Sequence, residues 1–144
     1  MNKSVAAYGV FALGVVIAFF TMNAEAKAQI LDRSLSLREL AGKLQTPDDI
    51  AHYLWRNIGF EEDQTQFGQE EYWQSPEELL TTRQGDCEDF ANFANELLRM
   101  NGYSSFLLNL YGGSSDHTVC VFKENGKYNV IDGAEVLRFE ANDL

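Results

Sequence analysis

Three residues whose types could carry covalent catalysis occur in order along the second half of this chain: Cys87, His117 and Asp132. A thiol needs a base to take its proton before it attacks a carbonyl, and the imidazole that serves as base needs a partner to orient it. The chain holds two histidines, and His52 lies in the polar gap of an apolar helical pattern. His52 is therefore predicted to be a surface residue, which leaves His117 as the candidate base.

Cys87 is expected to begin a helix that runs to about Met100, because an apolar stripe recurs at helical spacing and Asn101-Gly102 follows as a stop signal. The unsatisfied N–H groups and the positive end of the helix dipole favour thiolate at such a position. Gly85, two residues earlier, permits a tight approach of the backbone.

The acids next to the thiol act in the opposite direction. Asp86, Glu88 and Asp89 flank Cys87, and their negative charges raise the pKa of a nearby thiol. A protonated His117 beside Cys87 would have to outweigh them. The base is therefore expected to matter more for activation than the helix dipole does.

The strands after this helix place the histidine and the aspartate together. Asn125-Gly126 predicts a two-residue hairpin turn between strands 117–123 and 127–132. Pairing across that turn sets Asp132 opposite Val119, on the same face as His117. The rival orienter, Asp116, would point to the other face if the strand includes it, so Asp132 is favoured.

The same alternation bears on the second of the two cysteines. Cys120 falls on the face opposite to His117 and is predicted to be a buried apolar residue. A disulfide between Cys87 and Cys120 is the alternative for an exported protein. It would need the Cys120 side chain on the wrong side of its strand.

The remaining elements complete an α+β architecture, with helices first and a small antiparallel sheet after them. Helices are expected over 35–44, from Thr46-Pro47 to about Gly59, and from Ser75-Pro76, since each proline follows a capping residue. The segment 61–72 is predicted to be a loop. Further strands are expected at 105–111 and 136–139.

Composition and the N-terminus limit the function classes. The net charge of -11 argues against nucleic acid as a partner, because phosphate binding needs clustered Lys and Arg.

Lys3, an uncharged run over 5–20 and two A-x-A patterns up to Ala28 predict a signal peptide over residues 1–28, leaving 29–144 as one domain. The alternative is a membrane anchor through residues 5–22. Either reading places the domain outside the cytoplasm, in the periplasm or the extracellular space. After signal cleavage no stable membrane association is expected.

The stretch from Trp73 to Gly133 resembles the transglutaminase-like superfamily and is most similar to the bacterial transglutaminase-like cysteine peptidases. The resemblance is carried by the motif Gly85-Asp86-Cys87-Glu88-Asp89-Phe90-Ala91, by the preceding Trp73-Gln74-Ser75-Pro76, and by the order of His117 and Asp132 after it. It implies a papain-like core in which the nucleophile helix packs on the sheet. It also implies a catalytic triad of Cys87, His117 and Asp132.

The resemblance further implies acyl transfer through a Cys87 thioester, with a protein or peptide as substrate. Hydrolysis would make the protein a peptidase or amidase, and an amine acceptor would make it a transglutaminase; a non-catalytic binding module is the third alternative. The backbone N–H of Cys87 is expected in the oxyanion hole, with the Trp73 indole or the Gln84 side chain as a second donor. Trp73 is alternatively a core aromatic residue.

No cofactor is required by this chemistry, but some members of the peptidase group bind calcium through acids that flank the cysteine. Asp86 and Glu88 match those positions, and Asp89 is close. Carboxylate oxygens suit a hard cation. The alternative is an acidic first helical turn that satisfies backbone N–H groups.

Overall fold

The computed structural model describes residues 35–112 and 116–139. The predicted signal peptide or anchor, residues 1–28, lies outside them. Within the described part of the chain, no helix combines the length and the apolar character needed to cross a membrane.

Capping signals in the sequence set the first two helices, α3 (Leu37–Lys43) and α4 (Pro47–Asn57). Thr46 Oγ1 accepts from the Asp49 N–H at 3.1 Å, and the Asp49 carboxylate accepts from the Thr46 N–H at 3.0 Å. This reciprocal cap is the predicted one, and it begins α4 at Pro47. The helix buries Ile50 and Leu54, whereas Trp55, which the helical spacing places beside them, is 71% exposed.

The segment after α4 contains more structure than the sequence indicated. Gly59 does not end the helix but begins a two-residue strand, β1 (Gly59–Phe60), which pairs in parallel with β2 (Gln84–Gly85). A one-turn helix, α5 (Asp63–Gln66), lies in the stretch predicted to be a loop. The expected helix after Ser75 is α6 (Pro76–Thr82).

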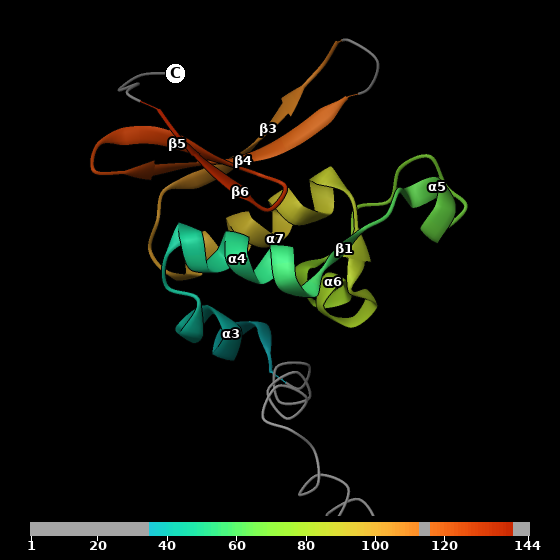
Figure 1. The fold of residues 1–144 in the computed structure, drawn as a ribbon, viewed down its shortest axis with the longest axis horizontal. Coiled ribbons are helices and arrows are strands. Elements are labelled where there is room, and N and C mark those ends of the chain that lie inside the picture. Colours follow the sequence, from blue (N-terminus) through green and yellow to red (C-terminus); the bar gives the residue numbers. More distant parts are fainter. Residues whose placement is uncertain (1–34, 113–115, 140–144) are drawn as a thin grey trace, which may run out of the picture. The chain divides into compact units, whose positions relative to one another are not determined.

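The nucleophile helix is α7 (Cys87–Met100), and it lies against a four-stranded antiparallel sheet in the order β3-β4-β5-β6 (Figure 1). The strands are β3 (Ser105–Leu110), β4 (His117–Glu124), β5 (Lys127–Asp132) and β6 (Glu135–Arg138). Asn125 and Gly126 have φ values of 52° and 81°, the left-handed values that a type I′ turn requires. The predicted β4–β5 register is confirmed, because Cys120 pairs with Ile131 and Glu124 with Lys127.

The two faces of the sheet differ in what they contact. Cys120, Phe122 and Ile131 belong to the core cluster that also contains Leu97 and Leu98 of α7. By the alternation of a strand, Val119 and Val121 point to the opposite face, and both are buried outside that cluster. The α+β class and the packing of the nucleophile helix on the sheet agree with the predictions.

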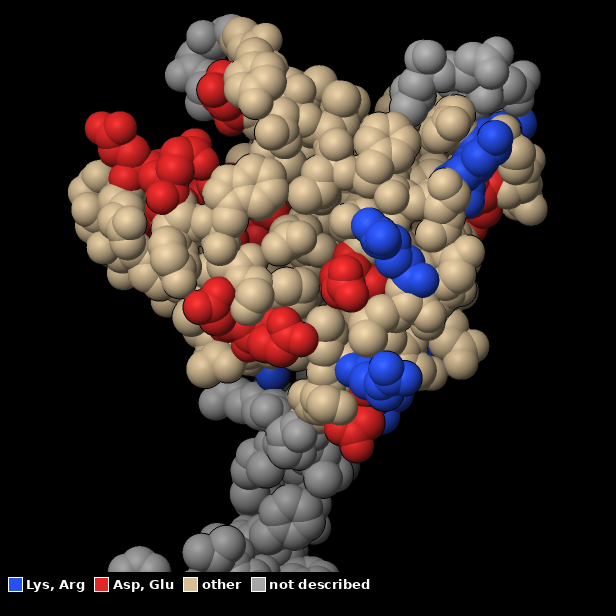
Figure 2. Space-filling view, turned by 180° about the vertical axis from the view of Figure 1, so that it is seen from behind, with Lys and Arg blue, Asp and Glu red and all other residues tan. Residues whose placement is uncertain are grey.

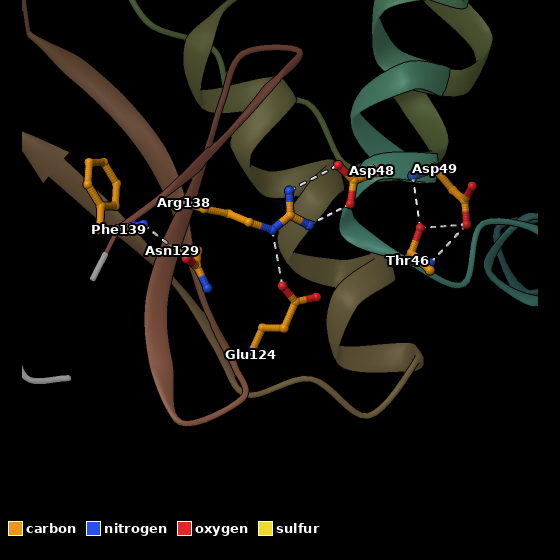
Figure 3. Close-up of polar contacts among 7 residues, drawn as sticks. All are labelled: Thr46, Asp48, Asp49, Glu124, Asn129, Arg138 and Phe139. Atoms are coloured by element: carbon orange, nitrogen blue, oxygen red, sulfur yellow. Dashed lines mark hydrogen bonds and ion pairs between the residues drawn. The ribbon is translucent and has the colours of Figure 1, made fainter. Parts of the chain in front are cut away.

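Polar contacts join the last strand to the second helix (Figure 3). The Arg138 guanidinium donates to both Asp48 oxygens, at 3.1 and 2.5 Å, and to the Glu124 carboxylate at 3.2 Å. The Phe139 N–H donates to Asn129 Oδ1 at 3.2 Å. The contact with Asp48 ties the β6 edge of the sheet to α4, and the other two lie within the sheet.

Candidate active site

Cys87 is the first residue of α7, and a close backbone approach places it there. Gly85 lies against the helix so tightly that a Cβ at this position would stand 2.5 Å from Asp89 Oδ2 and 2.8 Å from Leu79 Cδ1. Only glycine fits that gap, because nonbonded heavy atoms normally stay more than 3 Å apart. The resulting β2-to-α7 turn leaves the thiol half-buried at the edge of a pocket.

That pocket has a volume of about 220 Å³. Its lining comes from three parts of the chain: the segment before α6, the start of α7, and the facing ends of β3 and β4. The lining residues are Glu71, Trp73, Cys87, Glu88, Asn109, Tyr111, Asp116, His117 and Thr118. Cys87 and His117, which are 30 positions apart in sequence, therefore open on the same space.

His117 is held by Asp132, which extends from the neighbouring strand. His117 Nε2 lies 2.7 Å from Asp132 Oδ1, and the two side chains are equally half-exposed. A carboxylate accepts hydrogen bonds, so this contact favours the tautomer with the proton on Nε2 and the lone pair on Nδ1. Asp116 also lines the pocket, but its carboxylate is not the one bonded to the imidazole.

The pocket lies at the end of the sheet where α7 begins. His117 shares its strand face with Val119, opposite to the face that packs on α7. Cys87 and His117 therefore line the pocket from around the end of the sheet and not across its helix-covered face. Cys120 points to the helix side, is fully buried, and is a free thiol like Cys87.

The thiol is held by an acid in this structure. Cys87 Sγ donates to Glu88 Oε2 at 3.1 Å. Burial, together with the hydrogen bond to Glu88, raises the pKa of the Cys87 thiol to about 11, and a hydrogen bond from the Thr118 backbone acts in the opposite direction. The thiol is therefore neutral at physiological pH until its surroundings change.

Glu88 lies close to two other carboxyl groups, those of Glu71, which lines the same pocket, and of Asp86, which does not. The Glu88 charge raises the pKa of Glu71, against a hydrogen bond from Trp73 that lowers it. Burial, then the hydrogen bond with Glu88, raises the pKa of Asp86 to about 8.

Among the described residues no Lys or Arg lines the pocket. Figure 2 shows acidic side chains gathered over the lobe that carries α5. The site therefore disfavours an anionic ligand.

A second acidic cluster lies behind the pocket and joins α5 to α7. Carboxylate oxygens of Asp63, Asp86 and Asp89 all lie within 4.8 Å of one another. Asp63 and Asp89 are buried, and one oxygen each of Asp63 and Asp86 has no hydrogen-bond partner. Burial raises the pKa of Asp63, as expected for a carboxylate without compensating positive charge.

The observed cluster differs from the acidic set predicted from sequence. Asp86 and Asp89 belong to it, and the third carboxylate is Asp63; Glu88 accepts from Cys87 and lies with Cys87 and Asp86 in a neighbouring group that shares Asp86. Asp63 lies in the segment predicted to be a loop. Its carboxylate also accepts the backbone N–H of Tyr72, which ties α5 to the segment before α6.

Gln74 is a buried residue that sequence reasoning did not single out. Its backbone N–H and its side-chain amide donate to the two Asp89 oxygens, at 2.7 and 2.5 Å, and the amide also donates to the Gln84 carbonyl at 2.8 Å. Gln74 thereby fixes Asp89, two residues after the thiol. The adjacent Trp73 lines the pocket and is 43% exposed, so it is not a core aromatic residue.

Gln84, the other expected oxyanion donor, lies outside the pocket. Its side chain is exposed, and its carbonyl accepts from Gln66, Gln74 and Thr82. The β1–β2 pairing explains this placement, because it turns Gln84 toward Gly59 and away from the thiol.

A family model described as a transglutaminase-like domain matches residues 27–140. The chain therefore belongs to the transglutaminase-like domain family. No curated protein matches the chain.

Solved structures share the fold at low sequence identity. Calcium-bound LapG of Legionella pneumophila superposes with a TM-score of 0.56 at 17% identity, over 87% of this chain and 75% of LapG. A proposed cysteine protease from Cytophaga hutchinsonii gives 0.55 at 16% identity, over 82% of this chain and 45% of that protein. A structure described as a TGase gives 0.52 at 15% identity, over 92% of this chain and 38% of that one. The chain thus spans less than half the length of the last two.

Proposed function

We propose that this protein is an exported cysteine peptidase or amidase that cleaves an amide bond through a Cys87 thioester. The observation that carries the proposal is the 2.7 Å contact between His117 Nε2 and Asp132 Oδ1, on a pocket that Cys87 also lines. An oriented imidazole that lines the same pocket as a thiol is the arrangement that nucleophilic catalysis uses, and a binding module does not need it. The cysteine-protease neighbours are consistent with a protein or peptide substrate.

In this reaction His117 moves one proton in each half of the cycle. With Nε2 bonded to Asp132, Nδ1 accepts the Cys87 proton as the sulfur attacks the amide carbon. The imidazolium then protonates the leaving amine, and the C–N bond breaks to give the thioester. Water next attacks the thioester, giving one proton to Nδ1, and that proton returns to the Cys87 sulfur as the acid leaves.

Activation requires the thiol to leave its contact with Glu88. The pKa of about 11 describes a thiol that donates to a carboxylate. A protonated His117 next to sulfur favours thiolate, and substrate in the pocket displaces water and strengthens that attraction. Burial and the bond to Glu88 therefore hold the resting thiol neutral, and His117 is the group that ionises it.

The developing oxyanion needs fixed donors in the pocket. The backbone N–H of Cys87 is free of an intrahelical partner because Cys87 is the first residue of α7. The Trp73 indole N–H lines the same pocket and is the second proposed donor. Its present bond to Glu71 would be exchanged for the oxyanion.

The residues behind the thiol fit calcium. The donor set is entirely carboxylate, as a hard cation prefers, and buried oxygens of Asp63 and Asp86 lack a partner. Asp63, Asp86 and Asp89 would hold the ion. Calcium would supply positive charge that offsets these carboxylates and fixes the start of α7. The Legionella pneumophila neighbour is calcium-bound.

Two substitutions test the catalytic assignment through thiol reactivity. Iodoacetamide should label Cys87 before Cys120, because burial raises the pKa of the Cys120 thiol to about 12 and leaves it inaccessible. His117→Ala should slow labelling of Cys87, whereas His52→Ala, an exposed histidine on α4, should leave it unchanged. Faster labelling of Cys120, or a native Cys87–Cys120 disulfide, would remove Cys87 as nucleophile.

Export is tested separately from catalysis. The order of Lys3, apolar run and A-x-A patterns predicts a mature protein that begins at Lys27 or Gln29. N-terminal sequencing of the exported protein measures this directly. Retention of Met1 would reject cleavage and favour an anchor through residues 5–22.

A further inference from the structure

Strand β3, whose end lines the pocket, is an edge strand of the sheet among the described residues. In the order β3-β4-β5-β6, β3 pairs on one side with β4 and forms the sheet's outer strand on the other. An edge strand offers a row of backbone N–H and C=O groups with which another extended chain can pair. The residues that present these groups, and the direction in which β3 runs, determine what could bind there.

The register identifies the outward-facing groups. The Lys123 N–H donates to the Ser104 carbonyl at 2.9 Å, so 104 and 123 form a hydrogen-bonded pair. Hydrogen-bonded pairs recur every second residue, which directs the backbone of 106, 108 and 110 toward β4. The N–H and C=O groups of Ser105, Leu107 and Asn109 therefore point away from β4.

This edge lacks the features that normally block edge-to-edge pairing. β3 reads Ser-Phe-Leu-Leu-Asn-Leu, with no charged residue and no proline. The opposite edge, β6, has Glu135 and Arg138 at its two ends, and Arg138 is bonded to Asp48 and Glu124. Charged residues are a common protection of edge strands. The sheet is protected at β6 and open at β3.

The open edge leads directly to the thiol. Asn109, the last outward-facing residue of β3, and Tyr111 just beyond it both line the pocket that contains Cys87. Leu110 and Tyr111 are exposed, 47% and 76% respectively, so apolar contact surface accompanies the free backbone groups. A chain paired along β3 would continue past Asn109 into the pocket.

We infer that the β3 edge is the substrate-binding strand: an extended polypeptide pairs with the outward groups of Ser105, Leu107 and Asn109 and thereby delivers its amide bond to Cys87. This inference rests on the proposed function. It restricts the substrate to unfolded or flexible segments, because a folded strand or helix has its own backbone groups already bonded. Backbone pairing supplies affinity, and the pocket determines which substrate side chain is accepted.

The test measures binding to the full chain carrying Cys87→Ala, which cannot turn over its ligand. A displayed library of random peptides of about ten residues, a long strand, is selected on this protein. Enriched peptides should bind about 10-fold more weakly when Leu107→Pro is added than when Leu107→Ala is added. Both variants lose the leucine side chain, but only proline removes the outward N–H; that N–H is not bonded to β4, so β3 can form in both.

A second measurement avoids any change in the protein. Each amide of an enriched peptide is N-methylated in turn, and binding should fall at every second position only, since alternate amides of a strand face its partner. Equal binding to the two Leu107 variants with no alternation in the N-methyl series would overturn the inference. A library that yields no enriched peptide would overturn it as well.

Failure of the proposed function has a different signature. A small activated ester needs no strand pairing, so acylation of Cys87 in the unmodified protein reports on the catalytic assignment alone. Peptides that bind through β3 to a protein whose Cys87 is never acylated would keep the binding edge and reject the peptidase.

Discussion

Gly85→Ala should destabilise the protein although glycine is not needed there for backbone conformation. A Cβ would stand 2.5 Å from Asp89 Oδ2, 2.8 Å from Asp89 Cβ and 2.8 Å from Leu79 Cδ1. Overpacking of this kind costs about 1–3 kcal/mol. Moving Asp89 also weakens its bonds from Gln74, and a hydrogen bond to a charged group contributes about 1.5–3 kcal/mol. A loss of at least about 2 kcal/mol is expected.

Urea unfolding followed by circular dichroism measures this loss, and the melting temperature should fall by roughly 8–15 °C. The matched control is Gly42→Ala on α3, where a Cβ meets no atom within 4 Å. That change should raise stability by about 0.5–1 kcal/mol through helix propensity. If Gly85→Ala is neutral, or matches Gly42→Ala, the close approach of β2 to α7 is not as the structure describes it.

Three further changes test other parts of the structure. Arg138→Met should lower the free energy of unfolding by less than about 1 kcal/mol at pH 7, because the pair with Asp48 is largely exposed. Arg138 lowers the pKa of Asp48 from its usual 3.8, so the pair stabilises the fold above that pH and loses its effect as the pH falls below it. The urea midpoints of variant and parent should therefore converge at low pH. Glu88→Gln should speed iodoacetamide labelling of Cys87 at pH 8, since removing the carboxylate charge lowers the thiol pKa; unchanged or slower labelling would show that Glu88 does not hold the thiol neutral. Millimolar calcium should raise the melting temperature of the parent, and Asp63→Asn should reduce that shift; an equal shift in both proteins would remove Asp63 from the site.

The sequence predicted best those parts of the fold that local chemistry determines. Thr46, Pro47 and Asp49 define the start of α4 by contacts within one turn, and Asn125-Gly126 fixes the β4–β5 register by its turn type. The β1–β2 pair was missed because each strand has two residues, and Gly59 and Gln84 meet only through tertiary structure. Trp55 fits the apolar pattern of α4, yet it is exposed, and none of the helices and strands that the structure describes buries it.

In the site, too, contacts that follow from local sequence were predictable and contacts made by tertiary structure were not. The contact between His117 and Asp132 follows from the hairpin register, which sequence reveals. Asp63 and Gln74 reach the start of α7 from segments without a periodic pattern, so nothing local marks them. The one sequence signal for Gln74 is its place in the motif Trp73-Gln74-Ser75-Pro76, which carries the family resemblance but assigns Gln74 no role.

The orientation of Glu88 depended on details that sequence does not carry. Three acids flank Cys87, and their positions alone suit a shared ion as well as a helix cap. In the structure Asp86 and Asp89 lie with Asp63, while Glu88 accepts from the thiol and shares a hydrogen bond with Asp86. Each residue of a helix is rotated by about 100° from the one before it, so neighbouring acids at the start of α7 point in different directions. Local spacing alone therefore left both the shared ion and the helix cap open.

Mass spectrometry of the intact protein after addition of an activated acyl ester tests the central claim most directly. The account predicts one acyl group on Cys87, absent in Cys87→Ala, slower to form in His117→Ala, and released by water to regenerate the free thiol. Faster release by an added alkylamine, with the amide as product, would instead make the protein an amine-accepting transglutaminase. Acylation of Cys120, or none at all on the folded protein, would contradict the assignment of Cys87 as the nucleophile.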